Sequence, residues 1–265
     1  MNRLLKTVLN SASLLLALVI NYLSNTEIIG QTTVGGVSER YPTVLTPAGY
    51  AFSIWGLIYL LLLGFAGYQW YSRAKKENRE VIDRTGYYFI LANLANASWV
   101  IAWVNGLIAV SAGFILILLG SLIKLVQRLN LEKWDAPFPI ILFVWWPVVI
   151  YFGWVILAAI LNIQVFIVSL GWDQQTLTAE IFGAVFIALG TAVYLYLIYS
   201  RNLRESAAVG AWGLAAIAAK QSQANPVVTG IAVVCTAVLL INIAIHAFRN
   251  REHSFSRKAA LHLNG

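Results

Sequence analysis

The sequence TPAGYAFSIWGLIY at residues 46–59 decides the fold, because it opens an uncharged apolar stretch that continues to Tyr71. Pro47 and Gly49 are typical of the end of a loop and the start of a helix. The stretch that follows is long enough to cross a bilayer, which takes about 20 residues of α-helix. Its aromatic residues lie where the loop meets the membrane. They therefore either anchor the helix at the interface or form the roof of a ligand cavity.

The composition is that of a polytopic membrane protein. Hydrophobic residues make up 60% of the chain and charged residues only 11%, whereas soluble domains carry about 25% charged residues. The single cysteine, Cys235, lies in an apolar run, which excludes a disulfide framework and a cysteine metal site. The three histidines all lie near the C-terminus, which argues against a haem or metal centre inside a helical bundle. We expect no metal site and no cofactor.

Uncharged apolar runs predict an all-α bundle of eight transmembrane helices. The runs are Val8–Leu23, Tyr50–Tyr71, Gly86–Val104, Leu107–Ile123, Phe138–Leu170, Ile181–Tyr199, Ala207–Ala219 and Val227–Phe248. Ala207–Ala219 is too short to be assigned by its length. The charges decide it, because eight spans place every Lys and Arg except Arg40 and Lys220 on the side of the N-terminus. The positive-inside rule then puts both termini in the cytoplasm, in a bacterial inner membrane or a thylakoid membrane.

The predicted spans carry no residues that indicate catalysis or ion coupling. No Asp, Glu, Lys or Arg lies in the middle of a span, which disfavours a proton- or ion-coupled transporter. No nucleophile with a neighbouring histidine base is present, and no glycine-rich phosphate loop. We expect no catalytic residues and no enzymatic activity. The net charge of +7 reflects the position of the basic residues beside the membrane, and no nucleic-acid partner is expected.

Aromatic and amide residues recur on one face of two predicted helices. The third run carries Asn93, Asn96, Trp99 and Trp103, and the fifth carries Pro147, Tyr151, Trp154, Ala158, Leu161 and Asn162. Steps of three and four residues place each set on one helix face. Because polar groups are disfavoured in hydrocarbon, both faces should contact protein. Either the amides join helices to one another, or the two faces form the walls of one small-molecule pocket.

Three motifs point to a known family. They are Pro47-x-x-Tyr50-x-Phe52 followed by Trp55-x-x-x-Tyr59, then Leu94-Ala95-Asn96-x-x-Trp99, and Tyr151-x-x-Trp154-x-x-x-Ala158-x-x-Leu161-Asn162. Together they resemble the translocator protein / tryptophan-rich sensory protein family (TspO/MBR). That family is a five-helix membrane fold that binds porphyrins, sterols and benzodiazepine-type drugs. Ala48 and Tyr50 depart from it, since they stand where the family has a second proline and a tryptophan.

The resemblance implies a set of ligand-binding residues. It places Trp99, Trp154, Ala158, Leu161 and Asn162 in the cavity wall, with Tyr50 and the 26–49 loop as the roof. The predicted set is completed by Phe52, Trp55, Asn96, Trp103 and Tyr151. Arg40 is expected at the entrance, where it would meet a ligand carboxylate, because it is one of only two basic residues on that side.

The resemblance covers roughly residues 8–170, which suggests three parts of the chain. We expect a five-helix core in 1–170, three additional transmembrane helices in 171–248 and a basic cytoplasmic tail in 249–265. The additional helices carry small residues, namely Gly183, Ala188, Gly190, Ala211, Ala215 and Ala219. Small residues let helices pack closely in lipid. The additional helices therefore either cover a core face that other members use for dimerisation, or leave a separate binding groove beside the core.

Two function classes stay open at this point, and a third is weaker. The first is binding, sensing or translocation of a hydrophobic or amphipathic ring molecule such as a tetrapyrrole or a sterol-like compound. The second is a transporter or facilitator for a small neutral or apolar solute. The third is an assembly or scaffold protein without a ligand. The expected partners are the lipid bilayer and a hydrophobic small molecule, and a homodimer is left open.

Overall fold

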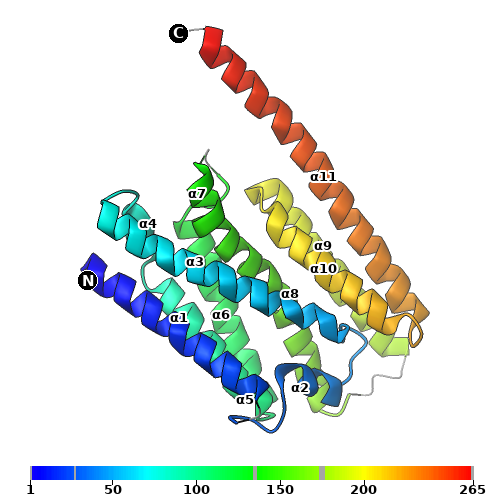
Figure 1. Ribbon diagram of the computed structural model, residues 1–265. Coiled ribbons are helices and arrows are strands. Elements are labelled where there is room, and N and C mark those ends of the chain that lie inside the picture. Colours follow the sequence, from blue (N-terminus) through cyan, green and yellow to red (C-terminus); the bar gives the residue numbers. More distant parts are fainter. Residues whose placement is uncertain (1, 27, 134–135, 173–176, 264–265) are drawn as a thin grey trace.

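The computed structural model describes residues 2–26, 28–133, 136–172 and 177–263, and they form a bundle of helices (Figure 1). The helices are α1 (Arg3–Asn25), α2 (Val34–Arg40), α3 (Ile54–Lys75), α4 (Glu80–Thr85), α5 (Tyr88–Val104), α6 (Ile108–Arg128), α7 (Phe138–Ile140), α8 (Trp146–Ser169), α9 (Leu177–Arg201), α10 (Arg204–Gln221) and α11 (Pro226–Leu263). A 3-10 helix, η1 (Gly49–Ser53), precedes α3, and a π-helical turn, η2 (Ile141–Trp145), precedes α8. The all-α fold class is confirmed.

Each predicted apolar run lies mostly in a helical segment of its own, and six helical segments in the described part of the chain are long and apolar enough to cross a membrane. The six are Arg3–Asn25, Gly49–Lys75, Ile108–Arg128, Phe138–Ser169, Thr178–Arg201 and Pro226–Arg249. Helix α5 is apolar but has only 17 residues. Helix α10 has 18 residues and is not among the six. A multi-pass membrane protein is therefore confirmed, and eight crossings remain a prediction.

The tight turn expected between the third and fourth runs is present. Gly106 has a φ of +71°, a left-handed conformation that glycine adopts without strain. Its N–H donates to the carbonyl of Trp103, and the N–H of Leu107 donates to that of Ala102. Helices α5 and α6 consequently pack against each other along their length as a hairpin.

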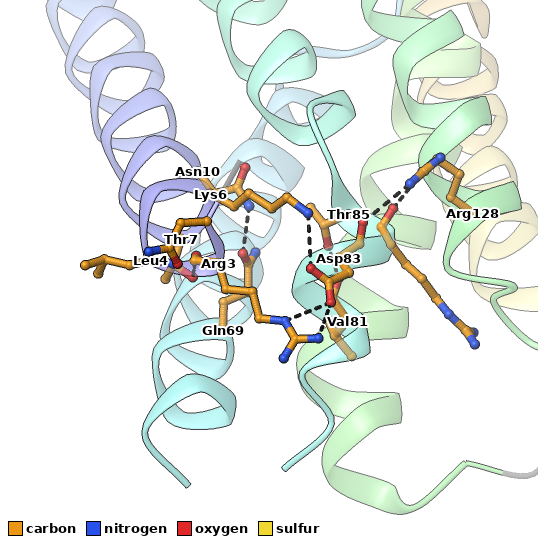
Figure 2. A network of polar contacts seen from close by, with 12 residues as sticks. Arg3, Leu4, Lys6, Thr7, Asn10, Gln69, Val81, Asp83, Thr85 and Arg128 are labelled. Atoms are coloured by element: carbon orange, nitrogen blue, oxygen red, sulfur yellow. Dashed lines mark hydrogen bonds and ion pairs between the residues drawn. The ribbon is translucent and has the colours of Figure 1, made fainter. Parts of the chain in front are cut away.

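Basic residues join several helix ends at one end of the bundle, which we call the basic end. Arg3 donates from Nε to Oδ2 of Asp83 at 2.8 Å, and Lys6 donates to Oδ1 at 3.1 Å (Figure 2). The hydrogen bond from Arg3 is the main reason why the pKa of Asp83 lies below its usual value. Arg128 donates from Nε to the carbonyl of Arg84 at 2.9 Å. The start of α1 and the end of α6 are thereby both attached to α4.

Helices α9, α10 and α11 extend the bundle on the side of α8 (Figure 1). Helix α10 contacts α8 at Gly153, where a β-carbon would lie only 2.7 Å from Cα of Ser206. Ser206 donates to the carbonyl of Val149 at 2.6 Å, and Tyr194 of α9 donates to the carbonyl of Gly153 at 2.8 Å. Gly153 and Ser206 therefore allow the close packing of α8 and α10.

The orientation of the bundle can be tested with reporter fusions placed after Asn202, Asn225 and His253. The positive-inside rule assigns the basic end to the cytoplasm. We therefore expect cytoplasmic reporters after Asn202 and His253 and a non-cytoplasmic reporter after Asn225. Identical results after Asn202 and Asn225 would show that α10 does not cross. Identical results after Asn225 and His253 would show the same for α11.

Candidate functional site

A cavity lies between η1, α3, α5 and α8, beneath the segment of residues 28–48 that contains α2. We call this segment the covering segment. The cavity is lined by Val34, Ser38, Thr43, Thr46, Pro47, Phe52, Trp55, Trp99, Trp103, Trp154, Ala158, Leu161, Asn162 and Val165. The centres of water molecules can occupy about 30 Å³ of it, and the empty space among its lining atoms amounts to about 450 Å³. The site is thus mostly apolar and aromatic, with a few hydroxyl groups and one amide.

The aromatic rings of the cavity are in contact with one another, and Trp55 is at their centre. Its ring centroid lies 5.9 Å from that of Trp99 and 6.2 Å from that of Trp154, the latter in an edge-to-face arrangement. Trp99 in turn stacks with Trp103 at 6.0 Å. Phe52 meets Trp154 edge to face at 6.2 Å. Helices α3, α5 and α8 therefore contribute to a single aromatic cluster with favourable ring geometries.

Two of these indole groups carry N–H donors without an acceptor. Trp99 is 4% exposed and Trp154 is 1% exposed. Within the part of the chain that the structure describes, no hydrogen-bond partner reaches Nε1 of either residue. Trp103 differs, since its Nε1 donates to the backbone carbonyl of Val34 at 3.0 Å and so ties α5 to the covering segment. Buried donors are nearly always paired, so the two free N–H groups indicate a place for an acceptor.

The amides of α5 and α8 are used differently. Asn162 donates from Nδ2 to Oγ of Ser111 on α6 at 3.1 Å, and its side chain remains in the cavity wall. Asn96 accepts from Nδ2 of Asn21 on α1 at 2.8 Å. The hydroxyl of Tyr59 also donates to Asn21. Asn96 therefore joins helices, whereas Asn162 both joins helices and lines the cavity.

The covering segment is held in place from α10 as well as from α5. The N–H of Ala48 donates to the carbonyl of Ala216 at 2.9 Å. Gln221 donates from Nε2 to the carbonyl of Thr43 at 3.1 Å. The hydroxyl of Thr46 accepts from the N–H of Thr43 at 2.7 Å, which closes a tight turn above the cavity.

A family model described as TSPO-like protein matches residues 7–245. The chain belongs to the TSPO-like protein family. The match continues past α8 through α9 and α10 and into α11, so it includes most of the additional helices as well as residues 7–170. A search of curated proteins and a search of solved structures found no match.

In this TSPO-like chain, most of the predicted ligand-binding residues lie together. Those that line the cavity are Phe52, Trp55, Trp99, Trp103, Trp154, Ala158, Leu161 and Asn162. Tyr151 is buried beside them and meets Trp55 edge to face at 6.0 Å, but it does not line the cavity. Asn96 also lies outside the lining, since it bonds with Asn21.

Two predicted residues of the roof and entrance lie elsewhere. The ring of Tyr50 packs edge to face on Trp212 of α10 at 5.1 Å, so it points away from the cavity. The expectation that Tyr50 roofs the cavity is therefore not met. Arg40 is exposed at the C-terminal end of α2 and is not part of the lining. The roof is instead made by residues of the covering segment.

Several residues at the cavity of the TSPO-like chain were not predicted individually. They are Val34, Ser38, Thr43, Thr46 and Val165, and Ser111 behind Asn162. Pro47, which belongs to the first family motif, also lines the cavity. Val165 follows Asn162 by three positions and could have been found by extending the periodic pattern of the fifth run. The residues of the covering segment show no periodicity, so only their inclusion in the 26–49 loop indicated a role.

Proposed function

We propose that this TSPO-like membrane protein binds a flat hydrophobic or amphipathic ring molecule, such as a tetrapyrrole or a sterol-like compound, in the cavity beneath the covering segment. Its role would be to bind the molecule for sensing or translocation rather than to transform it. The observation that carries the proposal is the pair of buried, unpaired indole N–H groups of Trp99 and Trp154 in an aromatic wall. Apolar pockets with a few oriented polar groups are typical of small-molecule sites.

The free donors indicate the polarity of the ligand. An acceptor such as a carbonyl or ring nitrogen would satisfy Nε1 of Trp99 or Trp154, whose unpaired burial is costly. Among the described residues no charged side chain lines the cavity, so an ionised group of the ligand would be unfavourable inside it. We propose that a carboxylate stays at the surface, where Arg40 is exposed.

The size of the cavity implies that binding involves movement. Ligand pockets for drug-sized molecules measure about 300–1,000 Å³, whereas water centres can occupy only about 30 Å³ here. The covering segment would have to shift outward to admit a ring system. The hydrogen bond from Trp103 to Val34 is one contact that such a shift would break.

Titration of the purified protein with protoporphyrin tests the proposal. Saturable quenching of tryptophan fluorescence with a stoichiometry of one is expected, because several indole rings lie at the cavity. The same titration of a free tryptophan derivative in detergent corrects the fluorescence for light that the protoporphyrin absorbs. Arg40→Ala is expected to weaken binding only modestly, and less at high salt, because an exposed pair contributes about 0–1 kcal/mol and is screened. Linear, unsaturable quenching would contradict the proposal.

A further inference from the structure

A second hollow lies on the outer face of the bundle, between α3, α8 and α10. We call it the lateral groove. It is lined by Ser53, Ile54, Leu57, Ile150, Glu205, Ala208, Val209 and Trp212. It shares no lining residue with the cavity, and water centres can occupy about 440 Å³ of it. The start of α3 separates the two sites, since Phe52 and Trp55 face the cavity while Leu57 faces the groove.

The walls of the lateral groove are apolar and open to the surroundings. Leu57 is 48% exposed and Trp212 is 41% exposed. Trp212 is held in position by the ring of Tyr50 at 5.1 Å and by a hydrogen bond from its Nε1 to the carbonyl of Ala51 at 3.4 Å. In a chain that spans a membrane, an open apolar groove on the outer face of the bundle meets lipid. Apolar walls of this kind favour contact with a lipid hydrocarbon chain.

One end of the groove carries an acidic group, Glu205, that has no hydrogen-bond or ion-pair partner among the described residues. Glu205 lies in the first turn of α10, at the basic end of the bundle. Its Oε2 atom is buried and accepts no hydrogen bond, and no ion pair joins Glu205 to a basic side chain among the described residues. Burial and the charge of Glu205 together raise the pKa of nearby Glu132 to about 8, although Arg204 opposes this. A cationic donor at this end would pair with the Glu205 carboxylate and would offset the repulsion between Glu205 and Glu132.

The length of the groove suits part of one acyl chain. Glu205 and Trp212 are seven positions apart on α10, which corresponds to about 10 Å along a helix. A lipid with its headgroup level with Glu205 would therefore extend its chain along α10 towards Trp212. Because Glu205 lies at the basic end, it is close to where the positive-inside rule places the membrane surface.

We propose that the lateral groove binds a membrane phospholipid whose headgroup carries a primary ammonium group, with one acyl chain between α3 and α10 and the ammonium group on Glu205. A primary ammonium group has three N–H donors and can form a charged hydrogen bond with the Glu205 carboxylate, which lines the groove. A quaternary choline headgroup has no N–H donor, and an anionic headgroup would be repelled by the carboxylate.

Native mass spectrometry of the delipidated, detergent-solubilised protein tests this inference. The probes are dioleoyl phosphatidylethanolamine, phosphatidylcholine and phosphatidylglycerol, which differ only in the headgroup. We expect the ethanolamine lipid to bind about tenfold more tightly than the choline lipid, as follows from one hydrogen bond to a charged group. Glu205→Gln should reduce the difference to within about twofold. Leu57→Trp, which fills the groove, should remove the tight-binding lipid altogether.

Matched variants control for the chemistry of each change. Glu77→Gln makes the same change at an exposed residue outside the groove, and Leu60→Trp adds the same bulk at a residue that is 68% exposed. Neither should alter lipid binding, and melting temperatures should show that all four variants fold. Equal binding of the ethanolamine and choline lipids by the unaltered protein would overturn the proposal. So would undiminished binding in Glu205→Gln or Leu57→Trp. Protoporphyrin titration of the same variants reports the cavity separately.

Discussion

Replacing Trp154 by alanine is expected to weaken protoporphyrin binding by about 30-fold. The substitution removes the ring that meets Phe52 and Trp55 in the cavity wall, together with one of the two unpaired N–H donors. An aromatic contact contributes about 0.5–1.5 kcal/mol beyond area burial, and a hydrogen bond contributes about 1 kcal/mol. A combined loss of about 2 kcal/mol corresponds to this change in affinity. The absorbance of the ligand provides a readout that does not depend on the number of tryptophans.

A second substitution separates packing from hydrogen bonding at this position. Trp154→Phe keeps an aromatic ring and loses the indole N–H, so we expect a fivefold to tenfold loss, from about 1 kcal/mol. Trp154→Phe is also the less destabilising of the two variants, because Trp→Ala in a core costs about 3–5 kcal/mol of stability. It therefore tests the site even if Trp154→Ala does not fold. Trp70→Phe is the matched control, since Trp70 is exposed and lies outside the cavity. Unchanged affinity in Trp154→Ala would rule out the cavity as the binding site.

Replacing Gly153 by alanine is expected to destabilise the contact between α8 and α10. The new β-carbon would lie 2.7 Å from both Cα and the carbonyl oxygen of Ser206, which are backbone atoms and cannot rotate away. Overpacking of this kind costs about 1–3 kcal/mol. The hydrogen bonds from Ser206 to Val149 and from Tyr194 to Gly153 should weaken as the helices separate. The measurement is the melting temperature in detergent, which should fall by several degrees, at roughly 2–4 °C per kcal/mol.

Gly113→Ala is the control for this substitution. Gly113 lies in α6, and a β-carbon there would meet no atom within 4 Å. Since alanine is the better helix former by about 1 kcal/mol, this variant should be as stable as the parent protein or slightly more stable. If both variants melted at the parent temperature, the close approach of α8 and α10 would be incorrect.

The helices and the two aromatic faces could be predicted because both depend on local patterns. Apolar runs bounded by charges set the helices, and steps of three and four residues brought Trp99, Trp154 and Asn162 to one cavity. Tyr50 shows where such reasoning stops. It lies in the 3-10 helix before α3, where residues two positions apart lie on different sides of the helix. Phe52 therefore enters the cavity while Tyr50 contacts Trp212.

The hydrogen-bond partners of the polar residues could not be predicted from the sequence, for a different reason. An asparagine on an inward helix face can be satisfied by a ligand or by another helix, and the sequence pattern is the same in both cases. Asn96 is bonded by Asn21, which is 75 positions away. Thr43 and Thr46 line the cavity through a turn whose shape depends on its own internal hydrogen bonds.

The hydrogen bonds from Ala48 to Ala216 and from Gln221 to Thr43 make the roof of the cavity and helix α10 mechanically dependent on each other. A ligand that displaces the covering segment must strain or break these hydrogen bonds. Part of its binding free energy is then offset by the displacement of the covering segment from α10. Allosteric coupling of this kind is reciprocal. If α10 shifts with the roof, a lipid or protein that binds the outer face of α10 changes the affinity of the cavity for its ligand. The cavity ligand then changes the affinity of α10 for that lipid or protein by the same factor.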